Sequence, residues 1–163
     1  MSLLDDFDVK ILNALQRDAT MQIEDVASEV GLSTSPCWRR IKRLEAEGII
    51  RRRVALLDRK KLNLSVTVFV AVRTNQHSPE WLTQFAGVVE DFPEVVEFYR
   101  MSGQIDYLLK IVVPDIDAYD AIYKRLISRL PVFDVSSMFA MEEIKASTVL
   151  PLNYTESKSK ARL

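Results

Sequence analysis

The sequence is poor in the residues that build disulfides, metal centres and nucleophilic active sites. Its 163 residues include one cysteine, Cys37, and one histidine, His77. A single cysteine cannot form an intrachain disulfide or a cysteine-rich zinc site, and the histidine lies far from it in an expected loop. No nucleophile–base pair or carboxylate cluster is visible, so we expect neither a catalytic site nor a metal site. Cys37 is interpreted as a small buried apolar residue.

Long apolar runs are also missing. No stretch approaches the roughly 18 apolar residues that span a bilayer. The N-terminal region carries Asp5, Asp6 and Asp8 where a secretory signal would carry positive charge, so we expect a cytoplasmic protein. With 48% hydrophobic and 28% charged residues, the composition is that of a globular protein, and the length suits two compact domains.

Positive charge is concentrated in one segment of the chain. Residues 39–61 contain ten Lys or Arg residues and three acidic residues, although the whole chain has a formal net charge of −1. A basic helix is often only a solvated surface. Here the basic segment follows the pattern of a helix-turn-helix, and this combination favours nucleic acid as the partner.

The helix-turn-helix pattern begins at Gly31, which can adopt the left-handed conformation that ends a helix. Ser33 or Ser35 can cap the next helix, and Pro36 is tolerated in its first turn. The apolar residues of this second helix recur at helical spacing and form one stripe: Cys37, Ile41 and Leu44. One face of the helix therefore packs, and the other face is cationic.

A wing is expected after this helix. Gly48 ends the helix, and residues 49–57 have the composition of a strand. A first helix capped by Asp5 and a second helix over residues 22–30 complete a winged helix-turn-helix domain at residues 1–57.

The residues expected to contact DNA lie at the start of the recognition helix, on its cationic face and in the wing: Ser33, Ser35, Trp38, Arg39, Arg40, Arg43, Arg51, Arg52 and Arg53. Arg40 has an alternative role, because it can instead face the protein and pair with an acid such as Asp25 or Glu29.

The second half of the chain has a different periodicity. Residues 58–64 are polar and basic and are expected to be a hinge or linker. Residues 65–154 predict the order β-α-β-β-α-β, with the elements at 65–74, 78–92, 95–101, 106–113, 115–130 and 132–144. Residues 155–163 are expected to form a disordered tail.

This order is the ferredoxin-like arrangement, one antiparallel sheet with both helices on one side, so the fold class is α+β. Both faces of the predicted sheet are apolar: Val66, Val68 and Val70 alternate with Phe69 and Ala71 along the first strand. Two helices cover only one face, so we expect a homodimer that packs through sheets or sheet edges.

The chain resembles the Lrp/AsnC family (leucine-responsive/asparagine regulator, "feast/famine") of bacterial and archaeal transcription regulators. The residues that carry the resemblance are Leu4-Asp5, Asp8, Ile11-Leu12, Val30-Gly31-Leu32-Ser33, Arg40-Ile41, Leu44-Glu45, Gly48-Ile49-Ile50, Gly103 and Asp106-Tyr107. The resemblance implies a nucleoid-associated protein with a winged helix-turn-helix, a hinge and a βαββαβ domain. In this family that domain dimerises, often assembles into octamers, and binds an amino acid near the turn between its second and third strands.

The residues at this turn suit such an effector. Backbone N–H groups around Gly103 can hold a carboxylate, and Asp106 can pair with an α-ammonium group. The alternative is that Gly103 is only a hairpin glycine and Asp106 a turn-flanking acid. The expected effector-binding residues are Met101, Ser102, Gly103, Gln104, Asp106, Tyr107, Ser136 and Ser137. The neighbouring side chains Met101, Ile105, Tyr107 and Leu108 favour an aliphatic amino acid, and no cofactor is expected.

The leading hypothesis is a sequence-specific DNA-binding transcriptional regulator whose assembly or DNA affinity responds to a small molecule, an amino acid by resemblance. Its partners would be double-stranded DNA, the effector and further copies of the chain, with no membrane. One alternative is a nucleoid-type DNA-organising protein of low sequence specificity. Another is an enzyme, because dimerising ferredoxin-like sheets also occur in small oxygenases.

Overall fold

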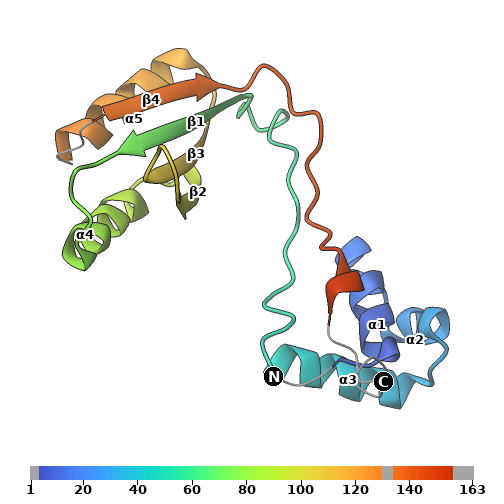
Figure 1. Cartoon of the computed structure of the whole chain (residues 1–163). Coiled ribbons are helices and arrows are strands. Elements are labelled where there is room, and N and C mark those ends of the chain that lie inside the picture. The colour runs from blue at the N-terminus through green and yellow to red at the C-terminus, as the bar shows by residue number, and fades with distance from the viewer. Residues whose placement is uncertain (1–3, 130–133, 156–163) are drawn as a thin grey trace. The chain divides into compact units, whose positions relative to one another are not determined.

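The computed structural model describes residues 4–129 and 134–155, and these residues form two compact units (Figure 1). Among them, the first unit runs to Leu56 and resumes at Lys145, and the second unit is Leu57–Ile144. None of the described helices has the length and apolar character needed to cross a membrane.

The first unit contains three helices: α1 (Asp6–Arg17), α2 (Ile23–Val30) and α3 (Thr34–Ala46). Asp5 and Asp8 cap α1 reciprocally, because each backbone N–H donates to the other carboxylate at 3.0 Å. Gly31 ends α2 with φ 76°, in the left-handed region. Ser33 stands at the N-cap of α3, but its side chain makes no capping hydrogen bond.

One small core holds the three helices together. Its buried side chains come from all three helices and include Ile11, Ala14, Val26, Cys37, Ile41 and Leu44. The last three are the stripe that the sequence predicted for α3. Burial also raises the pKa of the Cys37 thiol, although nearby Arg40 acts in the opposite direction. Cys37 is therefore a core residue, as the sequence predicted.

The wing strand expected at residues 49–57 does not form. Residues 51–58 carry no strand, and Val54, Leu56 and Leu57 are 58%, 71% and 73% exposed. The local composition favours a strand, but a strand also needs a partner backbone. Within the described residues, no other strand pairs with this segment.

The C-terminal segment from Lys145 belongs to the first unit, although the sequence analysis assigned residues 65–154 to the second domain. The side-chain amide of Gln16 fixes it to α1. Leu150 N–H donates to Gln16 Oε1 and Gln16 Nε2 donates to the Leu150 carbonyl, both at 3.0 Å. A short 3-10 helix, η1 (Leu152–Tyr154), follows, and the expected tail beyond Thr155 lies outside the described residues.

The second unit is a four-stranded antiparallel sheet with two helices. Its elements are β1 (Val66–Arg73), α4 (Pro79–Glu90), β2 (Val95–Arg100), β3 (Tyr107–Val113), α5 (Ile116–Arg129) and β4 (Asp134–Phe139). The strand order is β2-β3-β1-β4, and each neighbouring pair is antiparallel. The predicted ferredoxin-like α+β fold is confirmed. β4 ends at Phe139 rather than at 144, and Met141 and Ile144 beyond it are 97% and 91% exposed.

Both helices cover the same face of the sheet. Val68, Val70 and Val72 of β1 form one core with side chains from both helices, including Trp81 and Phe85 of α4 and Tyr119, Ile122 and Leu126 of α5. The opposite face carries Phe69, which lies across from Lys110 and Met138. Several apolar side chains on that face or its edge are about half exposed: Val96 (54%), Tyr99 (49%) and Met138 (48%).

Candidate DNA-binding surface and effector pocket

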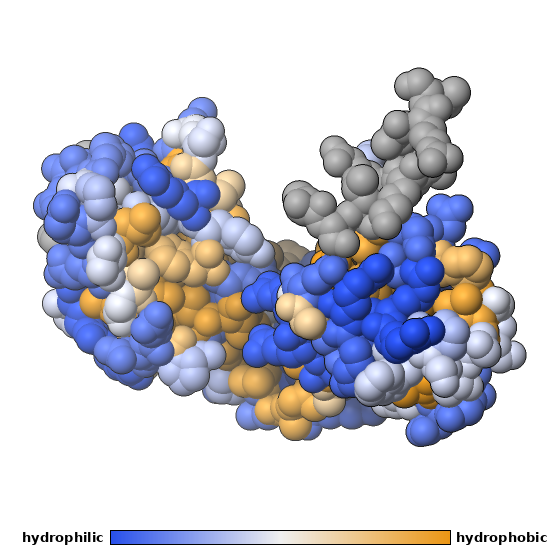
Figure 2. Space-filling view, turned by 90° about the horizontal axis from the view of Figure 1, so that it is seen from below, coloured by the Kyte–Doolittle hydropathy of each residue, from blue (hydrophilic) through white to orange (hydrophobic). Residues whose placement is uncertain are grey.

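The exposed side of α3 is the strongest candidate for contact with DNA. Trp38 is 47% exposed, and Arg39 beside it is exposed without an ion pair among the described residues. Ser33 and Ser35 are exposed at the N-terminal end of the same helix. Figure 2 shows a largely hydrophilic surface on this side of the first unit. A helix whose N-terminal residues and one cation project from the surface matches the way a recognition helix enters a major groove.

Two of the arginines expected on this surface are instead directed at Asp8, which is fully buried. Arg40 Nη1 donates to Asp8 Oδ1 at 2.8 Å and to Asp5 Oδ2 at 2.6 Å. Arg43 Nη2 forms an ion pair with Asp8 Oδ2 at 2.5 Å. The prediction that Arg40 and Arg43 face DNA is therefore not supported by their positions.

The alternative role of Arg40 is confirmed, because it faces the protein and pairs with acids, although these acids are not Asp25 or Glu29. Asp5 and Asp8 bind its guanidinium, whereas Glu29 pairs with Arg17. Burial alone would raise the pKa of Asp5, but hydrogen bonds from the Asp8 N–H and from Arg40 hold that pKa below its usual value. The local sequence contains a signal for this arrangement. Arg40 follows Cys37 by three positions and precedes Ile41, so helical spacing places it at one edge of the buried stripe. Arg43 lies further round the helix, and its long side chain reaches Asp8.

The three arginines after α3 also differ in whether they contact their own unit. Arg53 donates to Glu45 at 3.2 Å and to the Ala19 carbonyl at 3.5 Å, so it contacts its own unit. Arg51 and Arg52 are exposed, and neither forms an ion pair in the described part of the chain. They remain available for phosphate contacts, although the expected wing strand is not formed.

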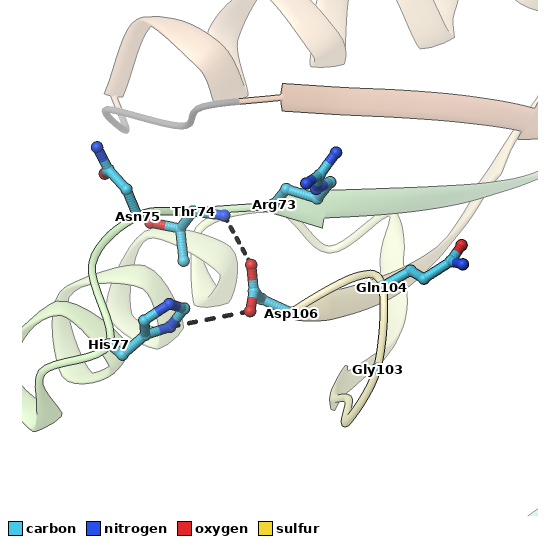
Figure 3. Close-up of a pocket in the computed structure, with 7 residues that line it drawn as sticks. All are labelled: Arg73, Thr74, Asn75, His77, Gly103, Gln104 and Asp106. Atoms are coloured by element: carbon cyan, nitrogen blue, oxygen red, sulfur yellow. Dashed lines mark hydrogen bonds and ion pairs between the residues drawn. The ribbon is translucent and has the colours of Figure 1, made fainter.

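A pocket of about 340 Å³ lies at one end of the sheet in the second unit (Figure 3). The end of β1 and the loop after it supply one wall, and the turn between β2 and β3 supplies the other. Its lining residues are Arg73, Thr74, Asn75, His77, Gly103, Gln104 and Asp106.

The carboxylate of Asp106 is the best-positioned group in this pocket. Its Oδ2 accepts a hydrogen bond from the Thr74 N–H at 2.8 Å, and its Oδ1 lies 3.8 Å from His77 Nδ1 (Figure 3). The backbone of Asp106 is fixed as well, since its N–H donates to the Val72 carbonyl at 3.0 Å and its carbonyl accepts from Met101 at 2.8 Å. The side chain is 29% exposed, so the carboxylate is accessible from the pocket.

Gly103 is required by its backbone conformation rather than by lack of space. Its φ is +133°, which side chains rarely tolerate, whereas a Cβ there would meet no atom within 4 Å. The turn therefore keeps an open approach to its backbone groups, as a ligand would need.

The structure brings together only part of the predicted effector site. Gly103, Gln104 and Asp106 line the pocket, whereas Met101 and Ser102 lie beside it. Tyr107 points into the core, with its ring 5.3 Å from that of Trp81. The alternation of side chains along β3 explains this difference, because neighbours in a strand point to opposite faces.

The two predicted serines of β4 also lie elsewhere. The Ser137 hydroxyl is hydrogen-bonded to that of Tyr119 on the helix-covered face, and Ser136 is exposed on the other face. The pocket residues that were not predicted from the sequence lie at the end of β1 and just after it: Arg73, Thr74, Asn75 and His77. The pairing of Val72 with Tyr107 brings this segment beside Asp106, and that register is not visible in local sequence.

Comparison with known proteins identifies the family. Residues 67–150 match the model of the Lrp/AsnC ligand binding domain, and residues 4–51 match a winged helix-turn-helix DNA-binding model. The chain belongs to the Lrp/AsnC family of transcriptional regulators. The predicted family, its DNA-binding fold and its regulatory function are thereby confirmed.

Its relatives are similar over nearly their full lengths. The chain is 51% identical over 160 residues to the glutamate uptake regulatory protein of Zymomonas mobilis, covering 98% of each chain. It is 48% identical to the DNA-binding transcriptional activator DecR of Escherichia coli, covering 92% of this chain and 99% of that one.

Solved structures of the family have the same fold. An AsnC family regulator from Agrobacterium tumefaciens is 62% identical with a TM-score of 0.90, covering 93% of this chain and 99% of that one. A transcriptional regulator of Neisseria meningitidis in complex with L-methionine is 37% identical with a TM-score of 0.87, covering 92% and 97%.

Proposed function

We propose that this Lrp/AsnC regulator binds double-stranded DNA through α3 and the adjoining basic segment. We propose further that an amino acid, bound beside Asp106, changes its DNA affinity or its assembly. The observation that carries the DNA-binding part is the exposed side of α3, where Trp38 and Arg39 project. The observation that carries the effector part is the partly open Asp106 carboxylate in a pocket of amino-acid size.

Two kinds of DNA contact are expected from these positions. Ser35, Trp38 and Arg39 are placed to reach base edges in the major groove, where an arginine can donate two hydrogen bonds to guanine. Arg51 and Arg52 lie outside the helix and suit phosphate contacts, which position the protein without reading sequence.

The open face of the sheet supports a homodimer. Phe69, Tyr99 and Met138 leave apolar surface on this face, around the 2.9 Å ion pair between Glu97 and Lys110. A second copy offers the same surface and can cover it with two-fold symmetry. The dimer would present two recognition helices to a pseudo-palindromic site, with half-sites about one helical turn or a multiple apart. Footprinting of a single half-site by a monomer would contradict this assignment.

In the pocket, an amino acid would use both of its α-charges. Its ammonium group would lie against Asp106 Oδ1, the oxygen not occupied by Thr74. Its carboxylate would accept hydrogen bonds from backbone N–H groups of the turn around Gly103, where the glycine leaves an open approach to the backbone. Binding can shift assembly or DNA affinity only by as much as the ligand prefers one state over the other.

The experiment that tests this function compares the wild-type protein with Asp106→Asn. Asparagine can still accept the Thr74 hydrogen bond, but it lacks the charge that holds an ammonium group. Calorimetry should show amino-acid binding to the wild type and its loss in the variant, while ligand-free DNA binding is unchanged. Undiminished amino-acid binding would move the site elsewhere. A specific duplex should also compete far better than an unrelated duplex at fixed salt, which a nucleoid-type protein of low specificity would not show.

A further inference from the structure

The pocket beside Asp106 is lined by polar residues and one glycine. Seven of the described residues line it, and six of them have side chains that can form hydrogen bonds. The seventh is Gly103, so none of these seven described residues has an apolar side chain. The apolar residues that favoured an aliphatic ligand lie elsewhere. Tyr107 is buried in the core at 3% exposure, and Met101, Ile105 and Leu108 do not line the pocket. A hydrocarbon side chain would therefore meet no apolar side chain among these lining residues, only the carbon atoms of polar side chains.

The α-charges of an amino acid leave several of these polar groups unused. Asp106 serves the ammonium group and the turn around Gly103 serves the α-carboxylate, which leaves five of the seven lining residues. The Thr74 hydroxyl already accepts the Gln76 N–H at 3.0 Å, and His77 faces Asp106 at 3.8 Å. The uncommitted side chains are therefore those of Arg73, Asn75 and Gln104. Arg73 ends β1, is exposed, and forms no ion pair within the described residues. In Figure 3, His77 turns towards Asp106, whereas the side chains of Arg73 and Gln104 do not.

These remaining groups are rich in donors. A guanidinium group only donates hydrogen bonds, and each amide side chain offers two N–H donors beside one acceptor oxygen. A carboxylate or carboxamide oxygen would satisfy them, and a carboxylate would do so with a charge-assisted, bidentate geometry at Arg73. An aliphatic side chain would displace water from the same donors without replacing its hydrogen bonds.

We propose that the pocket selects an amino acid whose side chain ends in a carboxylate or a carboxamide, and that Arg73 and Gln104 recognise that end. The inference rests on the proposed function, since it assumes that this pocket is the effector site. It narrows the ligand from amino acids in general to the acidic amino acids and their amides.

Calorimetry on the purified full-length protein tests the selection. The probes are L-glutamate, L-aspartate, L-glutamine and L-asparagine against L-leucine and L-methionine, at one pH and one salt concentration. At least one of the first four should bind at least tenfold more tightly than leucine and methionine. Arg73→Met should weaken that ligand at least tenfold and reduce the discrimination against methionine. Arg100→Met is the matched control, because Arg100 also ends a strand and is exposed but does not line the pocket.

The outcomes distinguish a failure of the ligand selection from a failure of the proposed function. If leucine or methionine binds as tightly as the polar amino acids and Asp106→Asn abolishes that binding, the selection is wrong and the proposed function stands. If no amino acid binds, both fail. If Arg73→Met leaves the discrimination unchanged, the recognition by Arg73 is wrong. If that variant does not fold, Gln104→Leu provides the same comparison, because Gln104 lies on an exposed turn.

Discussion

Replacement of Asp8 by alanine should destabilise the first unit more than any other single loss of a charge in α1. Asp8 is fully buried, receives the Asp5 N–H in the capping box and faces the guanidinium groups of Arg40 and Arg43. Asp5 stays in place as the N-cap, so the variant loses only the hydrogen bond from the Asp5 N–H to Asp8, at a cost of about 1 kcal/mol. Loss of one partner from a buried ion pair costs about 3–5 kcal/mol when the remaining charge stays buried.

The arginines reduce this second cost, because both keep a route to water. Their side chains are 26% and 37% exposed, so each guanidinium can turn outward once Asp8 is gone. We therefore expect a total loss of about 3 kcal/mol in the free energy of unfolding of this unit, below the sum of the two upper values. Hydrogen exchange followed by mass spectrometry measures it, because peptides from α1 and α3 should lose protection while peptides from β1 and β3 should not.

Asp6→Ala is the matched control for Asp8→Ala. Asp6 lies in the same first turn of α1 and adds the same negative charge near the helix N-terminus, but its side chain is exposed. We expect its loss to cost less than about 0.5 kcal/mol, the usual effect of a surface substitution. If Asp8→Ala costs no more than Asp6→Ala, the buried network does not stabilise the unit and the reasoning is refuted.

Three further predictions concern DNA binding, pH and the C-terminal segment. Arg39→Ala should reduce the binding free energy for a specific site by about 1–3 kcal/mol and relax the base preference. Arg52→Ala should instead weaken binding to all duplexes alike and reduce the slope of log affinity against log salt concentration by about one. Fluorescence anisotropy measures both effects. The pKa of Asp5 is lower in the folded state than in the unfolded state, so the ionised carboxylate stabilises the fold. This contribution is full above the unfolded pKa of about 3.9 and is lost as the pH falls through the folded value. Acid titrations followed by circular dichroism should show this loss in the wild type and not in Asp5→Asn. Gln16→Ala removes both hydrogen bonds to Leu150, so the segment around it should be cleaved faster in limited proteolysis while α2 and α3 stay protected.

The fold could be predicted because its signals are local. The alternation along β1 and the proline and glycine punctuation between elements predicted the order β-α-β-β-α-β, and the structure has that order. The capping role of Asp5 and the left-handed Gly31 were equally visible in sequence. The strand expected at residues 49–57 failed for the opposite reason, since strand formation depends on a partner that local composition does not supply.

The candidate site could be predicted only in part, because the register between two strands brings its residues together. Gly103 and Asp106 stand out in the sequence, but Arg73 and His77 join them only because Val72 pairs with Tyr107. The same limit applies to the arginines of α3. Helical spacing shows that Arg40 is near the edge of the buried stripe, but only the packing of α1 against α3 places Asp8 within reach of it.

The buried network also bears on how the protein can read DNA. With Arg40 and Arg43 bound to Asp8, Arg39 is the cation of α3 without an ion pair among the described residues. Lys42 pairs with Glu45 at 2.8 Å, but such an exposed pair is worth at most about 1 kcal/mol, so Lys42 can exchange Glu45 for a phosphate at little cost. One recognition helix therefore has few groups for base contacts, and each good contact discriminates by only about 1–3 kcal/mol. Two helices on one pseudo-palindromic site double that discrimination, so the specificity of this regulator should depend on the dimer that the open sheet face supports.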